Sequence, residues 1–307
     1  MQNPTGQPIQ FSIVIVNMNA ADFLEKCLDS IIKTKGDSTV EIILVDNGST
    51  DRSLEIARQL IPDLKLLPQS SNIGYVRANN LGLRQATGRY TMFLNNDTEL
   101  YAGCLTELAS FLDAHPDVGA ISPQILNPDG TDQGCARRFP SMINGLFGRR
   151  SVLTRLWPHN RWSRRFLVSR NHQGDESFEV EILSAACLVM RTELAKKLNG
   201  MDEDFQHYWV CAEMCSRVRA GGDRVFCVPR ARLVHYEGKG GGTKTFRQRC
   251  RMTIAFNRDA YLAYIKVHRL APLHPKRLFA AFALSMRAGC LMALQILRPG
   301  RATSSNS

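Results

Sequence analysis

Hydrophobic positions in the first 123 residues follow two alternating patterns. Nearly continuous apolar runs, typical of strands buried on both faces, occupy residues 11–16, 40–45, 64–67, 89–94 and 118–121. Between these runs, apolar residues recur at helical spacing over about residues 21–34, 54–60, 75–86 and 101–114. Repeated strand–helix units with short links predict an α/β fold, in which helices flank a mostly parallel sheet.

This alternation stops after residue 123. Segment 124–178 is rich in Arg, Pro, Gly and Asn, and its two tryptophans lie among Arg149, Arg150, Arg155, Arg161, Arg164 and Arg165. The segment is either a solvated insertion or a basic, aromatic loop that covers an anionic ligand. Beyond it, the pattern predicts strands and helices in turn, at 180–190, 191–198, about 204–220, 225–229 and 231–235.

The C-terminal region differs again. Residues 246–268 carry basic residues between apolar positions, and residues 278–297 are mostly apolar but contain Arg287. The second run is near the length of a membrane span, yet an arginine in its middle is costly in lipid. We therefore expect a C-terminal helical extension that lies on a membrane surface, with Arg277, Arg287 and Arg298 as lipid contacts. The alternative is a terminal helix that packs on the domain.

The composition of the chain indicates its net charge and the cellular compartment in which it is expected. The 39 Lys and Arg residues against 28 Asp and Glu give a net charge of +11, which favours polyanions such as a nucleotide, an anionic membrane or nucleic acid. No nucleic-acid motif accompanies the charge, so we expect no nucleic-acid partner. The nine cysteines are odd in number and scattered, as expected of free thiols in a reducing compartment. Residues 1–10 lack the features of a secretion signal, which indicates a cytoplasmic protein.

Candidate chemistry lies where three predicted strands end. The polar residues at these ends are Asn17 and Asn19, then Asp46 and Asn47, then Asn95, Asn96 and Asp97. Alone, each group would be an ordinary Asn/Asp turn. Because ligands of an open parallel sheet bind at the carboxyl ends of its strands, the three groups together predict one crevice. A carboxylate held at a rigid strand end suits a divalent cation.

Four motifs in these regions resemble family 2 glycosyltransferases with the GT-A fold, and especially the bacterial rhamnosyltransferase-like branch. They are IVIVNMN at 13–19, VDNGSTDRS at 45–53, NIGYVRANNLG at 72–82 and FLNNDT at 93–98. The resemblance covers about residues 10–240. It implies an inverting, metal-assisted enzyme that transfers rhamnose or another hexose. The donor would be a dTDP- or UDP-linked sugar, and the acceptor a saccharide or a polyprenyl-linked glycan.

The resemblance also assigns roles on the donor side. The donor-binding residues that it implies are Asn17, Asn19, Asp46, Arg77, Asn79, Asn95 and Asn96. Asp46 would hydrogen-bond the nucleotide base, and Arg77 would contact the diphosphate or the sugar. Asp97 and His235 would hold Mg²⁺ or Mn²⁺, although His235 is equally consistent with a structural role. The family's Asp-x-Asp motif keeps one carboxylate in this chain, which implies a weaker metal site.

The acceptor side departs from the family pattern. Residues 200–209 resemble the family stretch Gly-Phe-Asp-Glu-x-Phe that leads to an aromatic residue. The family then has Glu-Asp, whose Asp is the general base, but this chain has Val210 and Cys211. Neither side chain is a credible base for a sugar hydroxyl. Loss of a general base costs about 10²–10⁴ in rate.

Two explanations for the missing base remain open. In the first, a neighbouring carboxylate substitutes, from Glu213, Asp202 or Glu203. In the second, the chain is a nucleotide-sugar-binding protein that has lost turnover. Glu213 also has a structural alternative, as the i,i+4 ion-pair partner of Arg217.

These expectations divide the chain into four parts. They are a disordered N-terminus at 1–10, a nucleotide-sugar-binding half at 11–123, an acceptor-side half with the basic insertion at 124–240, and a basic helical tail at 241–307. The tail would place a cytoplasmic enzyme on the inner face of the membrane, where a polyprenyl-linked acceptor is found.

Overall fold

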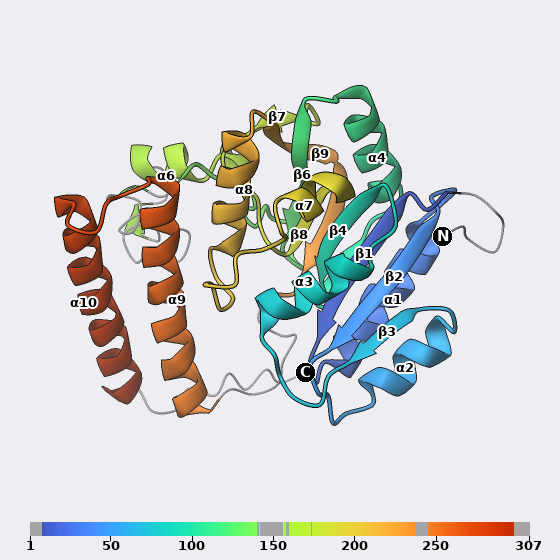
Figure 1. The fold of residues 1–307 in the computed structure, drawn as a ribbon, viewed down its shortest axis with the longest axis horizontal. Helices are drawn as coiled ribbons and strands as arrows, with labels where there is room; N and C mark the ends of the chain where they lie inside the picture. Colours follow the sequence, from blue (N-terminus) through green and yellow to red (C-terminus); the bar gives the residue numbers. More distant parts are fainter. Residues whose placement is uncertain are drawn as a thin grey trace.

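The computed structural model describes residues 8–139, 141, 156–157, 160–172, 174–237 and 245–297, and Figure 1 shows the fold. The elements up to residue 114 are β1 (Phe11–Asn17), α1 (Ala21–Thr34), β2 (Val40–Asp46), α2 (Ser53–Leu60), β3 (Lys65–Pro68), α3 (Tyr75–Gln85), β4 (Tyr90–Asn95), β5 (Thr98–Leu100) and α4 (Cys104–Ala114). Those that follow are β6 (Val118–Leu126), α6 (Arg161–Phe166), β7 (Phe178–Glu179), β8 (Cys187–Arg191), α7 (Thr192–Lys197), α8 (Val210–Ala220), β9 (Arg224–His235), α9 (Phe246–Val267) and α10 (Pro275–Leu297).

One nine-stranded sheet joins the two halves, in the order β3–β2–β1–β4–β8–β6–β9–β5, and β7 pairs with β9 beside this path. The expected α/β fold class is confirmed. The first four strands are parallel, whereas β8 pairs antiparallel with both β4 and β6, so the sheet is mixed. The parallel register sets Asn17 opposite Asp46 and Val16 opposite Asn95. The ends of β1, β2 and β4 therefore meet at one edge, as expected.

A glycine brings α3 close to the sheet beneath that edge. A Cβ on Gly82 would lie 2.3 Å from Cγ1 of Val14, the centre of β1. Since real contacts of that length do not occur, a side chain at Gly82 would push α3 away from β1. The glycine thus sets the position of the first turn of α3, which carries Tyr75 and Arg77.

Two strand predictions in the second half are wrong in extent. The strand expected at 180–190 is confined to its C-terminal part, in β8. The pieces expected at 225–229 and 231–235 are one strand, β9, whose register against β6 shifts near Pro229. Proline has no amide hydrogen to donate to the ladder, so an irregularity accommodates it.

The helix expected at 204–220 also begins later, at Val210. Trp209, just before it, has a left-handed backbone conformation with φ of 61°. That conformation cannot continue a right-handed helix, so residues 202–209 form a loop.

At the N-terminus, residues 8–10 are ordered against the sheet, in contrast to the expected disorder. The Gln10 amide donates to the Thr39 carbonyl at 2.9 Å, and the Arg89 amide donates to the Ile9 carbonyl at 3.0 Å. These backbone pairs extend the β1 side of the sheet by a few residues. Residues 1–7 lie outside the described residues, as do Arg149, Arg150 and Arg155 of the basic insertion.

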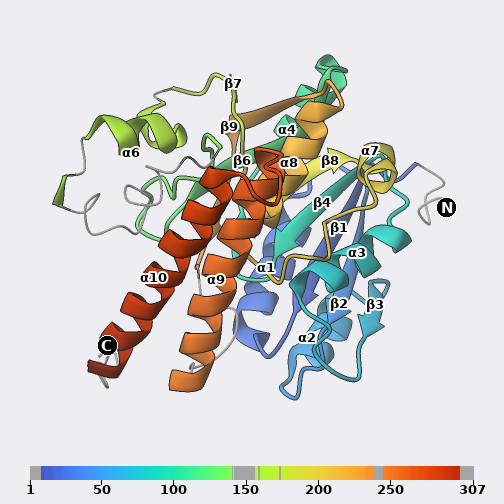
Figure 2. The ribbon, with the colours of Figure 1, turned by 60° about the vertical axis from the view of Figure 1, so that its left-hand side comes forward.

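The C-terminal helices α9 and α10 lie side by side on one flank of the molecule, with α9 next to α8 (Figures 1 and 2). Arg277 and Arg287, expected as lipid contacts, turn toward α9 instead. Arg287 Nη1 donates to Asn257 Oδ1 at 2.7 Å, and Arg277 Nε donates to Tyr261 Oη at 2.9 Å. Both guanidinium groups thereby gain hydrogen-bond partners that lipid tails would not supply. Arg298 lies outside the described residues.

Candidate active site at the strand ends

The ends of β1 and β2 are joined by a carboxylate. Asp46 is buried, and its Oδ1 accepts hydrogen bonds from Asn17 Nδ2 at 3.2 Å and from Ser49 Oγ at 2.5 Å. Its Oδ2 accepts from the Ser49 amide at 2.8 Å. Beside it, the buried Oδ1 of Asn47 has no hydrogen-bond partner among the described residues. Asp46 therefore shapes the turn after β2, and Asn47 leaves an unused acceptor next to it.

Asparagine side chains link this turn to the other strand ends. Asn17 Oδ1 accepts from Asn96 Nδ2 at 2.7 Å, which connects β1 to the turn after β4. Asn19 Oδ1 accepts from the Thr50 amide at 2.7 Å, and Asn19 itself has a left-handed φ of 50°. The three polar groups that the sequence analysis identified thus form one connected network.

Asp97 meets His235 at the centre of this edge. The two residues are buried, and Oδ1 of Asp97 lies 3.1 Å from Nε2 of His235. The other ring nitrogen, Nδ1, lies 2.7 Å from Oε1 of Gln133. Gln133 uses its Nε2 to donate to the His235 carbonyl and to Asn127 Oδ1, so its Oε1 is left as an acceptor.

This network assigns the histidine tautomer. Because Gln133 Oε1 accepts, Nδ1 of His235 carries the hydrogen, and Nε2 of a neutral ring presents a lone pair to the Asp97 carboxylate. Two acceptors that face each other at 3.1 Å require a proton or a cation between them. Neighbouring ligands of an octahedral cation with bonds of about 2.1 Å are about 3 Å apart, so the pair fits a divalent metal.

The metal would need ligands from elsewhere as well. Among the described residues there is no group of three or more His, Cys, Asp or Glu side chains that could hold an ion. Asn95 lies next to the pair, with its Nδ2 3.4 Å from Nε2 of His235, and its Oδ1 accepts from Tyr75 Oη at 3.3 Å. Phosphate oxygens and water are the natural remaining ligands for a Mg²⁺ or Mn²⁺ ion.

The other donor-side candidates lie on α3. Arg77 is exposed, and its Nε lies 3.4 Å from Glu203 Oε2. Asn79 is buried and donates to the Tyr75 carbonyl within its own helix, at 3.0 Å. The neighbouring Asn80, which sequence reasoning missed, accepts from the Met201 amide and donates to the Met201 carbonyl, both at 2.8 Å. Asn80 thus ties α3 to the loop on the acceptor side.

Each candidate carboxylate on the acceptor side already has a cationic partner. Glu213 accepts from Arg217 Nε and Nη2 at 2.7 and 2.8 Å, and burial raises the pKa of Glu213. Asp202 pairs with Lys266 of α9 at 2.5 Å, and Glu203 pairs with Arg77 as described above. This geometry favours the structural alternative for Glu213 over catalysis.

Cys211 is linked through Ala185 to Tyr75 of α3. It is buried, and burial raises the pKa of its thiol, so it is neutral near pH 7. The backbone of Ala185 hydrogen-bonds to Cys211, and the Ala185 carbonyl accepts from Tyr75 Oη at 3.1 Å. The position at which the family pattern has its base is therefore placed near Tyr75, but the neutral thiol present there does not accept a proton readily.

Two further residues contact the loop before α8 and were not predicted from the sequence. Asp259 of α9 is fully buried, and its carboxylate accepts from the backbone amides of Gln206, His207 and Tyr208 at 3.0–3.3 Å. Arg137 lies over the Trp209 ring, 6.0 Å from its centroid. An aspartate inside a basic helix and an arginine in a basic segment carry no local signal, because only tertiary contacts distinguish them.

Comparison with known proteins decides the family. The family model described as "Glycosyl transferase family 2" matches residues 12–197, which is more than half of the chain. The chain belongs to glycosyl transferase family 2. His235, one member of the facing pair, lies beyond the matched segment of this glycosyltransferase.

Two curated relatives support this result. The chain is 29% identical over 241 residues to an N-acetylglucosaminyl-diphospho-decaprenol L-rhamnosyltransferase of Mycobacterium tuberculosis, which covers 75% of this chain and 77% of the relative. It is 41% identical over 194 residues to a PGL/p-HBAD biosynthesis glycosyltransferase of Mycobacterium bovis, covering 59% of this chain and 72% of the relative. Both the glycosyltransferase activity and the rhamnosyltransferase-like resemblance are thereby confirmed.

A solved structure supports the fold. The chain resembles a mannosyltransferase from Pyrobaculum calidifontis, solved in complex with GDP-Man and Mn²⁺, with a TM-score of 0.56 and 19% identity. The match covers 97% of this chain and 82% of the other. It confirms the GT-A fold of this glycosyltransferase.

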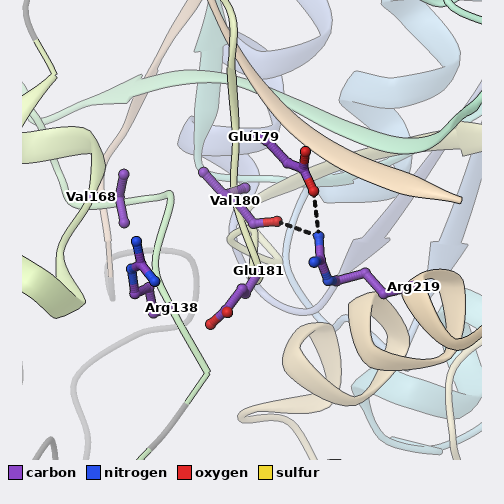
Figure 3. A pocket seen from close by; sticks show the side chains of 6 residues that line it. All are labelled: Arg138, Val168, Glu179, Val180, Glu181 and Arg219. Atoms are coloured by element: carbon purple, nitrogen blue, oxygen red, sulfur yellow. Dashed lines mark hydrogen bonds and ion pairs between the residues drawn. The ribbon is translucent and has the colours of Figure 1, made fainter.

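A hollow of about 180 Å³ lies away from the strand ends, beside β7 (Figure 3). Its lining residues are Arg138, Val168, Glu179, Val180, Glu181 and Arg219. Glu179 pairs with Arg219 at 2.8 Å, and this hydrogen bond lowers the pKa of Glu179. Since Arg219 is about two helical turns beyond Cys211 on α8, the hollow is separate from the glycosyltransferase site.

Proposed function

We propose that this glycosyltransferase moves rhamnose or another hexose from a dTDP- or UDP-linked donor to a saccharide or polyprenyl-linked acceptor, with inversion at the anomeric carbon. The observation that carries the proposal is the Asp97–His235 pair, whose facing acceptor atoms lie at the edge where β1, β2 and β4 end. The M. tuberculosis relative, named a rhamnosyltransferase that acts on a decaprenol-linked sugar, supports the choice of sugar and acceptor.

The donor would lie along this edge of the sheet. The base would meet Asp46 and the backbone at Asn17, with the unused Oδ1 of Asn47 as an acceptor for a ring N–H. Arg77 would leave Glu203 and contact the diphosphate, since a surface ion pair contributes only about 0–1 kcal/mol and exchanges readily. The half at 11–123 would thus bind the donor and the half at 124–240 the acceptor.

Asp97 and His235 would hold Mg²⁺ or Mn²⁺, and an imidazole ligand favours Mn²⁺ of the two. Such a metal, when bound, neutralises the charge that develops on the departing diphosphate. Gln133 would keep the His235 ring in the tautomer that offers Nε2, as ligand-orienting partners do in metal sites. The Mn²⁺ in the solved mannosyltransferase supports this proposal.

Calorimetric titration of UDP and dTDP, with and without Mn²⁺, tests the donor site. We expect Mn²⁺ to strengthen nucleotide binding by the wild type, and Asp97→Ala to abolish that increase. Asp63→Ala, in an exposed turn, is the matched control and should bind as the wild type does. Failure of the wild type to bind either nucleotide would overturn the proposal.

The alternative function is nucleotide-sugar binding without efficient turnover, and the neutral, buried Cys211 favours it. Restoration of the family pattern by Val210→Glu with Cys211→Asp separates the two. A large gain in transfer in the double variant would show that the native site is impaired. Unchanged or reduced transfer would show that the native chain uses another base.

We also propose that α10 attaches the enzyme to the inner face of the cytoplasmic membrane. Among the described residues, α10 is the helix that is long and apolar enough to cross a membrane, and most of it is exposed. Its exposed large apolar side chains are Leu278, Phe279, Phe282, Met286, Leu294 and Ile296. Exposed Arg247 and Arg251 lie near its C-terminal end, because Gln295 bonds to Thr253 of α9. These charges suit anionic lipid headgroups.

Co-sedimentation with vesicles of phosphatidylglycerol tests the attachment, with phosphatidylcholine vesicles for comparison. We expect binding to the anionic vesicles, and a strong decrease in the variant Phe279→Ser/Phe282→Ser. Ile32→Ser, which replaces an exposed apolar residue on α1, is the control and should bind normally. Equal binding by the Phe279→Ser/Phe282→Ser variant would contradict the proposal.

A further inference from the structure

Two buried hydrogen-bond donors on the acceptor side lack an acceptor atom. Nε of Arg137 and Nε1 of Trp209 have no hydrogen-bond partner among the described residues. The Arg137 guanidinium lies over the Trp209 ring, 6.0 Å from its centroid, so the two donors belong to neighbouring side chains. Both side chains are half-buried, and the guanidinium is charged at any physiological pH. An anionic ligand would supply the acceptor atoms that both groups lack.

The backbone directs Arg137 toward α8. Arg137 forms an antiparallel bridge with Ile182, and residues opposite each other in such a bridge point to the same side. Ile182 packs with Cys211 and Ala212 of α8. Burial raises the pKa of the Cys211 thiol, and the charge of Arg137 opposes this shift, as a nearby cation does. Arg137 therefore lies near the position at which the family pattern has its base.

The next residue, Arg138, has different surroundings. It lines the hollow beside β7 together with Glu181, the residue before Ile182 (Figure 3). Successive side chains of an extended segment point to opposite sides, which explains why two adjacent arginines differ in this way. Arg138 is therefore a matched control for Arg137.

The Trp209 ring connects Arg137 to the C-terminal helices. It meets the ring of Phe256, on α9, with 5.9 Å between the centroids. The guanidinium of Arg287, on α10, lies 5.3 Å from the centroid of Phe256. A lipid-linked acceptor whose chain lies at α10 would therefore bring its phosphate groups past α9 to Trp209 and Arg137.

We propose that Arg137 and Trp209 bind the diphosphate of a lipid-linked acceptor, an inference that rests on the function proposed above. A guanidinium group forms two parallel hydrogen bonds to phosphate oxygens, and the indole N–H donates a further one. The donor diphosphate would lie at the Asp97–His235 pair, so the two diphosphates occupy separate places. The acceptor sugar, attached to its own diphosphate, is thereby brought to the side of α8 on which Cys211 lies.

Calorimetric titration of a synthetic N-acetylglucosaminyl-diphospho-octyl acceptor, in the presence of dTDP and Mn²⁺, tests this site. We expect Arg137→Gln to weaken binding about 10–100-fold, the usual effect of losing a hydrogen bond to a charged group. Arg138→Gln should bind as the wild type does. Arg137→Lys keeps the charge but not the paired donors, and its affinity should lie between those of the wild type and Arg137→Gln.

A second variant tests the indole donor. Trp209→Phe keeps a ring against Phe256 but removes the N–H group, and we expect it to weaken binding about 3–10-fold. Binding of dTDP in the presence of Mn²⁺ should be the same in every variant, which also shows that each variant is folded.

The octyl glycoside of N-acetylglucosamine separates recognition of the diphosphate from a general loss of acceptor binding. It has the same sugar and chain but no phosphate. The wild type should prefer the diphospho acceptor to this glycoside, and Arg137→Gln should lose most of that preference. A variant that keeps the full preference would contradict the proposal, because Arg137 would then not recognise the diphosphate.

The outcomes separate this inference from the proposed function. Undiminished binding of the diphospho acceptor by Arg137→Gln would overturn this inference alone. An equal loss in Arg137→Gln and Arg138→Gln would overturn it too, since the effect would then be one of overall charge. A wild type that binds neither dTDP nor UDP would overturn the proposed function and this inference with it.

Discussion

The donor side and the acceptor side of the site are held together in different ways. On the donor side, Asn17 hydrogen-bonds directly to both Asp46 and Asn96, which follow or end neighbouring strands. On the acceptor side, the loop before α8 is held from outside, by Asp259 of α9. The first arrangement follows from strand register, whereas the second depends on a helix that lies about 50 residues further along the chain. We therefore expect that the acceptor side can change its chemistry, as at Val210 and Cys211, with little effect on donor binding.

Removal of the Asp259 carboxylate, which holds the loop before α8, should have the largest effect on stability and transfer. Asp259→Ala would leave three backbone amides of the loop without their buried acceptor, and we expect the free energy of unfolding to fall by about 3–5 kcal/mol. Transfer should fall with it, while the folded fraction still binds dTDP. Urea unfolding and calorimetry check the two effects.

Asp259→Asn is the matched variant, because it keeps one acceptor oxygen and should lose less stability. Equal loss of dTDP affinity and of transfer in the folded Asp259 variants would contradict the independence of the two sides.

The second change acts on the donor side alone. Gln133→Leu removes the acceptor that orients His235, and we expect Mn²⁺-dependent nucleotide affinity to fall about 10–100-fold. Gln59→Leu, on the exposed face of α2, is the control. Titration of dTDP at several Mn²⁺ concentrations measures the effect. Unaltered Mn²⁺ dependence in Gln133→Leu would mean that His235 has a purely structural role.

A packing change tests how tightly α3 packs on β1, near the sheet edge where β1, β2 and β4 end. Gly82→Ala would force a Cβ against Val14, and we expect a loss of about 1–3 kcal/mol in the free energy of unfolding. Val14→Ala in the same chain should restore part of it, since it removes the atoms that clash. On α10, where nothing lies within 4 Å of the corresponding Cβ, Gly289→Ala should be neutral or stabilising. Similar losses for both glycines would show that α3 is not tightly packed.

The smallest difference expected concerns pH. Burial opposes ionisation of Glu41, but hydrogen bonds from Lys65, Ser12 and Thr87 outweigh it and lower the pKa of Glu41. Its stabilisation is therefore present above the usual value of 4.5 and is lost as pH falls through the folded-state pKa. Burial raises the pKa of Glu213, so its stabilisation is present below 4.5 and is lost as pH rises through the folded-state pKa.

Unfolding of Glu41→Gln and Glu213→Gln between about pH 4 and pH 7 compares the two. Relative to the wild type, the cost of Glu41→Gln should grow with pH and that of Glu213→Gln should shrink. Trends of the same sign would mean that Glu41 and Glu213 lie in similar electrostatic surroundings.

Local sequence patterns predicted which polar residues lie together at the sheet edge where β1, β2 and β4 end. Asn17 and Asp46 directly follow an apolar run, Asp97 follows one after two asparagines, and parallel strands bring their carboxyl ends together. Patterns failed where contacts are long-range. Gln133 and Asp259 are recognised only by what they touch, and Arg287 was read as a lipid contact because its partner Asn257 lies on another helix.

By itself, the sequence determined the order of strands and helices in the first half except for the short strand β5, which it missed. It also determined the polar strand ends and the departure at Val210 and Cys211. The spacing of apolar residues and the residue types of turns are local signals that extend over a few residues. A short segment of sequence is therefore enough to recognise them. The tertiary structure decided which side chains form ion pairs with one another and which are exposed to solvent. Glu213 pairs with Arg217 while His207 stays exposed beside Tyr75, because burial and partner choice arise only when α8 and α9 pack together with the sheet edge.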